Sequence, residues 1–126
     1  MKRLFALLTS LLLLAGCGEK GAESAYQQIS QEKAKEMMDT QEVIILDVRE
    51  QDEYDSGHIP GALLLPVGTI DEDTAGEVIP EKDSTVLLYC RSGNRSKAAS
   101  DTLVKLGYTK VYEFGGINTW PYAIEQ

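Results

Sequence analysis

Short runs of aliphatic and β-branched residues alternate along this chain with longer stretches that have helical spacing. The apolar runs occupy residues 43–46, 62–65 and 86–89, and the Val-Tyr-Glu-Phe segment at residues 111–114 is predicted to form another strand. Uninterrupted apolar runs of this length are typical of strands buried on both faces, and such strands occur in parallel sheets. Because strands that alternate with helices pack into α/β domains, the pattern predicts a mainly parallel sheet with helices on both faces.

The helical stretches have recognisable ends. Ser30 is a favourable N-cap for a helix over residues 31–39. A second helix is predicted over residues 96–106, and Gly107 is expected to end it. Shorter helical segments are expected at residues 74–79 and 117–120.

The N-terminus has the layout of an export signal. Lys2 and Arg3 precede an almost wholly apolar stretch over residues 4–14, which is too short for a comfortable membrane span. The ending at residues 14–17, Leu-Ala-Gly-Cys, resembles the lipobox of bacterial lipoproteins, in which signal peptidase cuts before the cysteine and the cysteine is lipidated. The alternative is an ordinary signal peptide with an incidental cysteine.

The lipobox resemblance divides the chain into three segments. Residues 1–16 are expected to be a lipoprotein signal peptide, residues 17–25 the lipidated Cys17 and a flexible tether, and residues 26–126 the folded domain. The protein is then exported and held on a membrane by lipid, since several acyl chains anchor far better than one. Gly18, rather than aspartate, points to the periplasmic face of the outer membrane, or to the outer face of the cell membrane in a one-membrane bacterium.

Composition limits the partners and cofactors. The chain has 20 acidic and 12 basic residues, which argues against a nucleic-acid partner because phosphate backbones are bound by lysine and arginine. With Cys17 acylated, Cys90 and the single histidine are too few soft ligands for a metal site. No metal and no cofactor are expected, and a monomer is the default oligomeric state.

The candidate active site is the loop that begins at Cys90. It lies between the strand at residues 86–89 and the helix at residues 96–106, so the thiol faces a helix N-terminus, where N–H groups and the helix dipole favour the thiolate. Gly93 allows the loop to curl and turn N–H groups inward. The result is an anion cradle around a nucleophilic sulfur. The alternatives are a buried, inert thiol and a Cys–His dyad, which would depend entirely on His58.

Segments on either side of this loop are similar to signatures of the rhodanese superfamily. Residues 47–50, together with residues 53–54 and the Gly-His-Ile-Pro-Gly-Ala segment at residues 57–62, resemble the first signature of that family. The Gly-Gly-Ile segment at residues 115–117, together with Trp120, resembles its C-terminal signature. The chain is therefore identified as a member of the rhodanese superfamily.

The loop itself completes the resemblance. Residues 90–95 match the family's cysteine, two residues, glycine, one residue and arginine, and the similarity extends over residues 29–120. It implies a rhodanese-like three-layer α/β fold with about five strands. The implied reaction moves sulfane sulfur from thiosulfate or a related donor to a thiol or cyanide acceptor through a persulfide on the nucleophile Cys90. The implied substrate-binding residues are Arg91, Ser92, Gly93, Asn94, Arg95 and Ser96.

Several polar residues have both a functional and a structural interpretation. Arg91 and Arg95 are candidates for orienting an anionic donor, but Arg95 is equally compatible with pairing to carboxylates and bracing the loop. Asp47 and Arg49 are candidate supporting residues, and structural pairing with loop groups or with Glu53 is the favoured interpretation. His58 is interpreted as a turn residue.

Two other functions are compatible with parts of this pattern. A cysteine phosphatase or arsenate reductase also uses a cysteine, a cradle of amides and an arginine, but phosphatase loops hold one residue more than the four between Cys90 and Arg95. A membrane-tethered persulfide carrier with little turnover would keep the cysteine and an intact loop. Turnover beyond one stoichiometric sulfur load distinguishes the enzyme from the carrier.

Overall fold

The structure is a computed structural model, and it describes residues 25–126. The predicted signal peptide, Cys17 and most of the predicted tether lie outside the described residues. Within residues 25–126, no helix is both long enough and apolar enough to cross a membrane. In chain order the elements are β1 (Gln27–Gln28), α1 (Gln31–Thr40), β2 (Ile44–Asp47), α2 (Gln51–Ser56), β3 (Leu63–Leu64), η3 (Val67–Thr69), α3 (Glu72–Val78), β4 (Thr85–Cys90), α4 (Asn94–Lys105), β5 (Lys110–Gly116) and η4 (Ile117–Thr119).

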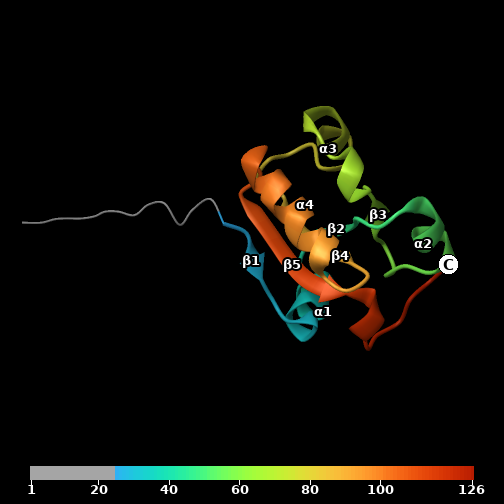
Figure 1. Cartoon of the computed structure of the whole chain (residues 1–126). Helices are drawn as coiled ribbons and strands as arrows, with labels where there is room; N and C mark the ends of the chain where they lie inside the picture. Colours follow the sequence, from blue (N-terminus) through green and yellow to red (C-terminus); the bar gives the residue numbers. More distant parts are fainter. Residues whose placement is uncertain (1–24) are drawn as a thin grey trace, which may run out of the picture.

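In the described part of the chain, five parallel strands form one sheet in the order β1-β5-β4-β2-β3 (Figure 1). Leu46 of β2 pairs with Leu88 of the central strand β4, and Val86 of β4 pairs with Val111 of β5. Because the strands are parallel, their carboxyl ends meet at one edge of the sheet, where Cys90 ends β4. The predicted α/β class and parallel sheet are confirmed.

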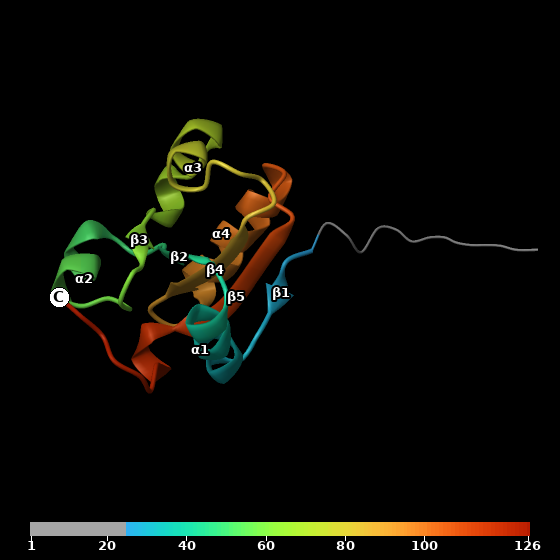
Figure 2. The same ribbon diagram turned by 180° about the vertical axis from the view of Figure 1, so that it is seen from behind.

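Side chains alternate between the two faces of the sheet, and each face has its own apolar cluster. Leu46 and Leu88 point to the face covered by α3 and α4, where they pack in one cluster with Leu103 of α4. Ile45 and Leu87 belong to the cluster on the opposite face, which α1 and the C-terminal segment cover. Figure 1 and Figure 2 show α4 and α1 on opposite sides of the sheet. The helices therefore form the outer layers of the predicted three-layer fold.

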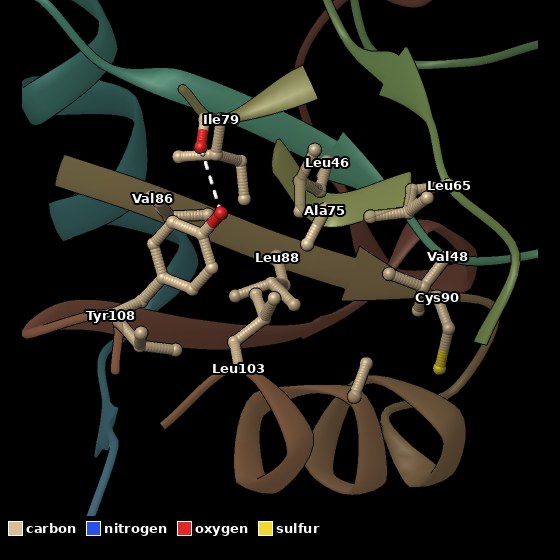
Figure 3. Close-up of a cluster of buried hydrophobic side chains, with 12 residues drawn as sticks. Leu46, Val48, Leu65, Ala75, Ile79, Val86, Leu88, Cys90, Leu103 and Tyr108 are labelled. Carbon is tan, nitrogen blue, oxygen red and sulfur yellow. Dashed lines mark hydrogen bonds between the residues drawn. The ribbon is translucent and has the colours of Figure 1, made fainter. Parts of the chain in front are cut away.

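The apolar cluster beneath α4 extends to the candidate nucleophile. Ile79, Leu88 and Leu103 are fully buried in it, and the Tyr108 hydroxyl donates to the Ile79 carbonyl oxygen at 2.7 Å. Figure 3 shows Cys90 at the opposite end of this cluster from Tyr108, with its sulfur directed toward α4. Burying an aliphatic side chain of this size contributes about 1.5–3 kcal/mol, so the cluster holds β4 firmly against α4.

The structure differs from the sequence predictions mainly at the sheet edges. β1 and α2 have no predicted counterpart, because β1 is only two residues long and α2 buries no side chain that would create an apolar stripe. The apolar run at residues 62–65 forms only the short edge strand β3, so Leu63 is 44% exposed rather than buried on both faces. α4 begins at Asn94, earlier than predicted, because Gly93 in a left-handed conformation serves as its N-cap.

Candidate active site

Cys90 is positioned by the end of β4 and the start of α4. It is the last residue of β4, and it is 1% exposed. Arg91, Ser92 and Gly93 connect it to α4, toward which the sulfur is directed (Figure 3). A cysteine at a strand end facing the N-terminus of a long helix is the arrangement that the sequence predicts.

The Cys90 sulfur receives hydrogen-bond donors from the loop. The Gly93 N–H group donates to Sγ at 3.0 Å, and the Cys90 thiol in turn donates to the Ser96 hydroxyl oxygen at 3.5 Å. Burial raises the pKa of the Cys90 thiol, but the Ser96 hydroxyl and the N–H groups of Ser96, Gly93 and Ser92 outweigh burial and lower this pKa below its usual value. The loop therefore favours the thiolate without help from a histidine.

The glycines at the end of β5 support the loop from beneath. Gly116 has no room for a side chain, since a Cβ atom there would lie 2.6 Å from the Ser92 Cα atom and still closer to the Arg91 carbonyl group. The Arg91 carbonyl oxygen in turn accepts the Asn118 N–H at 3.1 Å. Gly93 has φ = +110°, which residues with a side chain rarely adopt. The sharp curl of the loop therefore requires glycine both within it and beneath it.

Arg95 braces the loop against α2. Its guanidinium donates to both carboxylate oxygens of Glu53, at 2.8 and 3.0 Å. The hydrogen bond from Arg95 lowers the pKa of Glu53 from 4.5 to about 2, against the opposing effect of burial. Of the two roles predicted for Arg95, the structure places it in the bracing one, and donor binding by Arg95 stays a prediction.

The remaining loop side chains are of two kinds. Arg91, Ser92 and Asn94 are exposed, and the Arg91 guanidinium makes no hydrogen bond or ion pair with another residue in the described range 25–126. Ser96 is 0% exposed and lies beside the sulfur of Cys90. The Ser96 hydroxyl contacts the nucleophile from inside the fold, and its backbone N–H is also directed at the sulfur, so substrate binding by Ser96 stays a prediction.

Asp47 and Arg49 form a buried ion pair at the carboxyl end of β2. Nε and Nη2 of Arg49 donate to the Asp47 carboxylate at 2.9 and 2.6 Å, and Nη2 also donates to the Gly57 carbonyl oxygen at 2.7 Å. The Tyr89 hydroxyl donates to the same carboxylate at 2.7 Å. These contacts are structural, as favoured from the sequence. Of the two partners expected, loop groups and Glu53, Arg49 binds the loop carbonyl of Gly57, and its ion pair is with Asp47.

His58 lies outside the active loop. Its Nδ1 contacts the Tyr54 carbonyl oxygen at 2.9 Å, its ring stacks on the Tyr54 ring with centroids 3.8 Å apart, and its Nε2 lies 3.4 Å from Glu125. His58 is thus a turn residue, and it forms no dyad with Cys90. Over the described residues 25–126, no group of three or more histidine, cysteine, aspartate or glutamate side chains is arranged to hold a metal ion.

Glu113 of β5 belongs to the site, and the sequence predictions miss it. This glutamate is 2% exposed, and its Oε2 accepts the Ser96 hydroxyl at 2.5 Å and the Gly115 N–H at 2.8 Å. Its Oε1 accepts the Gln28 side-chain amide at 3.2 Å. The sequence contained an indication of this role. Glu113 lies two residues after the buried Val111 in the same strand, so its carboxylate points toward α4 and not toward solvent. A carboxylate at a buried strand position needs polar partners, which marks it as a candidate for the site.

Comparisons with known proteins agree with this geometry. Residues 30–122 match the family described as the rhodanese-like domain. The chain belongs to this family. The thiosulfate sulfurtransferase GlpE of Coxiella burnetii is 36% identical over 96 residues, which cover 75% of this rhodanese chain and 87% of that protein. The thiosulfate sulfurtransferase PspE of Escherichia coli is 36% identical over 72 residues, which cover 57% of this chain and 68% of that protein.

Solved rhodanese structures share the fold. A structure described as rhodanese with anions from Escherichia coli has a TM-score of 0.63 and 28% identity, and the match covers 68% of this chain and 99% of that chain. The solution structure of the rhodanese-like domain of the Alr3790 protein from Anabaena has a TM-score of 0.71 and 27% identity, covering 78% and 77% of the two chains. The predicted rhodanese membership and three-layer fold are confirmed.

Proposed function

We propose that this rhodanese-family chain is a sulfurtransferase that takes sulfane sulfur from thiosulfate or a related donor. The Cys90 thiolate attacks the outer sulfur of the donor, the donor's S–S bond breaks, and sulfite leaves with the electron pair. An acceptor thiolate or cyanide then attacks the outer sulfur of the Cys90 persulfide. The persulfide S–S bond breaks, and the Cys90 thiolate returns.

The observation that carries this proposal is the position of Cys90 Sγ within a ring of donors. Sγ lies 3.0 Å from the Gly93 N–H group, and the loop N–H groups of Ser92, Gly93 and Ser96 lower the thiol pKa. The same donors are suited to hold the negative charge of a persulfide. Relatives with the names thiosulfate sulfurtransferase GlpE and PspE support thiosulfate as the first donor to test.

Arg91 is the proposed contact for an anionic donor. It follows the nucleophile directly, its side chain is exposed, and within residues 25–126 no carboxylate pairs with it. Arg95, by contrast, is held by Glu53 through two hydrogen bonds. A guanidinium that makes no competing ion pair is free to bind a sulfonate-like oxyanion with several fixed donors.

The alternatives gain no support from the site. The loop keeps four residues between Cys90 and Arg95, one fewer than a phosphatase loop, and its arginine is engaged by Glu53. A persulfide carrier would share the whole site, so only turnover separates it from the enzyme. The experiment below is designed around that difference.

The test is sulfur loading of the full-length chain with Cys17→Ser, in which Cys90 is the only thiol. The protein is incubated with thiosulfate, and its intact mass is measured before and after addition of cyanide. Thiocyanate release is followed over time in parallel. We expect a gain of one sulfur atom on Cys90, its removal by cyanide, and many thiocyanate molecules per protein molecule.

The matched variant carries Cys90→Ser in addition. It should gain no sulfur and release no thiocyanate above background, while circular dichroism shows an unchanged fold. A folded protein with a free Cys90 thiol that gains no sulfur from thiosulfate or polysulfide would overturn the proposal. A single sulfur load without repeated release would establish the carrier instead of the enzyme.

We also propose that Cys17 is lipidated and anchors the domain to a membrane on its outer side. The support is the sequence alone: Lys2 and Arg3 precede an apolar run over residues 4–14, and Leu-Ala-Gly-Cys ends it at Cys17. The chain expressed in a bacterium with a palmitate analogue should incorporate the label and sediment with membranes. Cys17→Ser should lose both properties. An unlabelled, soluble and processed wild-type protein would establish an ordinary signal peptide instead.

A further inference from the structure

Glu113 is a buried carboxylate whose charge the structure does not neutralise with a cation. It is 2% exposed, and no lysine, arginine or histidine among residues 25–126 forms an ion pair with it. Its three hydrogen-bond donors are the Ser96 hydroxyl, the Gly115 N–H group and the Gln28 amide, all of which are neutral. Burying a carboxylate without a cation is costly, and a proton source within hydrogen-bond reach would remove the charge.

That proton source is the Cys90 thiol, connected to Glu113 through one side chain. The Cys90 S–H group donates to the Ser96 hydroxyl oxygen at 3.5 Å, and the Ser96 hydroxyl donates to Glu113 Oε2 at 2.5 Å. Ser96 is 0% exposed and Cys90 is 1% exposed, so this path runs inside the protein. The three groups therefore form a continuous chain of hydrogen bonds from the nucleophile to the carboxylate.

We propose that Glu113 is a positioning residue that takes the thiol proton of Cys90 through Ser96, an inference that rests on the sulfurtransferase function proposed above. The S–H bond breaks, the proton passes to Ser96 Oγ, and the original Ser96 hydroxyl proton passes to Glu113 Oε2. Cys90 keeps the electron pair as a thiolate, and Glu113 becomes a neutral carboxyl. Ser96 then donates to the thiolate, and Glu113 donates to Ser96.

The hydrogen-bond chain from Cys90 through Ser96 to Glu113, called the relay below, supplies a proton acceptor for the thiol, as a histidine base does in other cysteine enzymes. The single histidine, His58, is engaged by Tyr54 and Glu125, and Cys90 is buried away from bulk water. Glu113 also lines a groove of about 410 Å³ that is bordered by the loop, β5 and the start of α1. Glu113 therefore lies between the buried nucleophile and a groove that borders solvent.

Other charged groups around the relay act on it only through space. Two cations of α4 lie near it. The charge of Cys90 contributes to raising the pKa of Arg95, and Lys97 lines the same groove as Glu113. Burial and the nearby charges of Asp101 and Glu113 raise the pKa of Tyr26. All of these groups remain in place when Glu113 alone is changed, so a Glu113 variant reports on the relay.

The test is the thiolate absorbance near 240 nm of the full-length Cys17→Ser protein, measured from pH 5 to 9 against a matched Cys90→Ser protein. No sulfur donor is present, so the result does not depend on sulfur transfer. Glu113→Gln keeps the shape of the side chain, and its amide oxygen can still accept from Ser96 and Gly115, but its NH2 group cannot replace Oε1 as the acceptor for Gln28, and the side chain cannot take the proton. Its thiolate signal at pH 6 should fall by about tenfold, the change that one pKa unit produces.

Two further variants separate the relay from simple charge repulsion. Ser96→Ala should cause the same loss as Glu113→Gln, and the double variant should lose no more than either one, because each breaks the same path. Asp101→Asn removes an exposed charge on α4 itself and should leave the thiolate signal unchanged. An equal or larger thiolate signal in Glu113→Gln would overturn the proposal, since it would show that Glu113 only repels the thiolate.

An infrared measurement keeps the proposal testable if Glu113→Gln does not fold. At the pH where the wild-type thiolate absorbance is present, the C=O stretch of a protonated buried carboxyl should be present as well, because one proton shift along the relay produces both. Thiolate absorbance without this carboxyl band would contradict the relay. Failure of sulfur loading with an intact relay signal would overturn the proposed function alone.

Discussion

Replacing Glu53 with glutamine tests the brace between α2 and the active loop. Glutamine keeps the side-chain size and still accepts the Glu50 N–H, which lies 2.9 Å from Glu53 Oε1, but it removes the charge that pairs with Arg95. The lowering of the Glu53 pKa from 4.5 to about 2 corresponds to roughly 3 kcal/mol. Because the Glu53 and Arg95 side chains are 26% and 33% exposed, solvent screening reduces this to about 1–2 kcal/mol.

The effect should depend on pH in one direction. The pKa of Glu53 is lower in the folded protein than in the unfolded chain, so the stabilisation is fully present above the unfolded pKa of about 4.5 and is lost as the pH falls toward 2. At pH 7 the wild type should be about 1–2 kcal/mol more stable than Glu53→Gln. At pH 3 this difference should shrink by more than half.

Urea unfolding followed by fluorescence of Trp120, the only tryptophan, measures these differences in the Cys17→Ser background. Asp55→Asn is the control, because Asp55 lies in the same helix and forms no ion pair within the described residues. It should change stability little at either pH. Equal stability of wild type and Glu53→Gln at pH 7, or a difference of the same size at pH 3, would refute the reasoning.

Three other substitutions test separate features of the site. Gly116→Ala adds a Cβ atom where the backbone of Arg91 and Ser92 lies, so it should displace the loop and reduce thiocyanate release by about 100-fold. Undiminished turnover would contradict the close contact between Gly116 and this backbone. Tyr89→Phe removes one of the donors to the Asp47 carboxylate and leaves the Ile59 N–H without its acceptor, and it should cost about 1–3 kcal/mol in urea unfolding, so unchanged stability would argue against that network. Arg91→Ala should raise KM for thiosulfate by about tenfold or more, whereas Lys105→Ala at the far end of α4 should not; an equal KM in both would exclude Arg91 as the donor contact.

Helix ends and strand phases could be predicted because they depend on neighbouring residues. Ser30 caps α1 as expected, with its hydroxyl accepting the Lys33 N–H at 2.9 Å. Gly107 ends α4 with φ = +103°, and the next N–H bonds back to the Leu103 carbonyl oxygen at 3.1 Å. α2 escaped prediction because its stability comes from a polar capping box and its packing on neighbours, neither of which produces an apolar period.

Predictions about which polar groups meet across the fold were less successful. Arg49 was expected to pair with loop groups or with Glu53; it binds the Gly57 carbonyl oxygen and Asp47, and Glu53 binds Arg95. Ser96 was expected to bind substrate, which stays a prediction, but the contact of its hydroxyl with Glu113 was not foreseen. In each case several carboxylates were available to one donor, and the sequence contains no information on which of them lies within reach.

The α/β fold, the order of its main elements and the loop that favours a thiolate at Cys90 could all be predicted from the sequence. These features depend on apolar periodicity, on capping residues and on the position of Gly93, all of which act over a few neighbouring residues. The contact of Arg95 with Glu53, 42 residues away, and that of Ser96 with Glu113, 17 residues away, depend instead on how the strands pair. The parallel register of β4 and β5 pairs Cys90 with Gly116 and so brings the carboxylate of β5 beneath the loop that follows β4, and the pairing of β2 with β4 brings α2, which follows β2, next to the same loop.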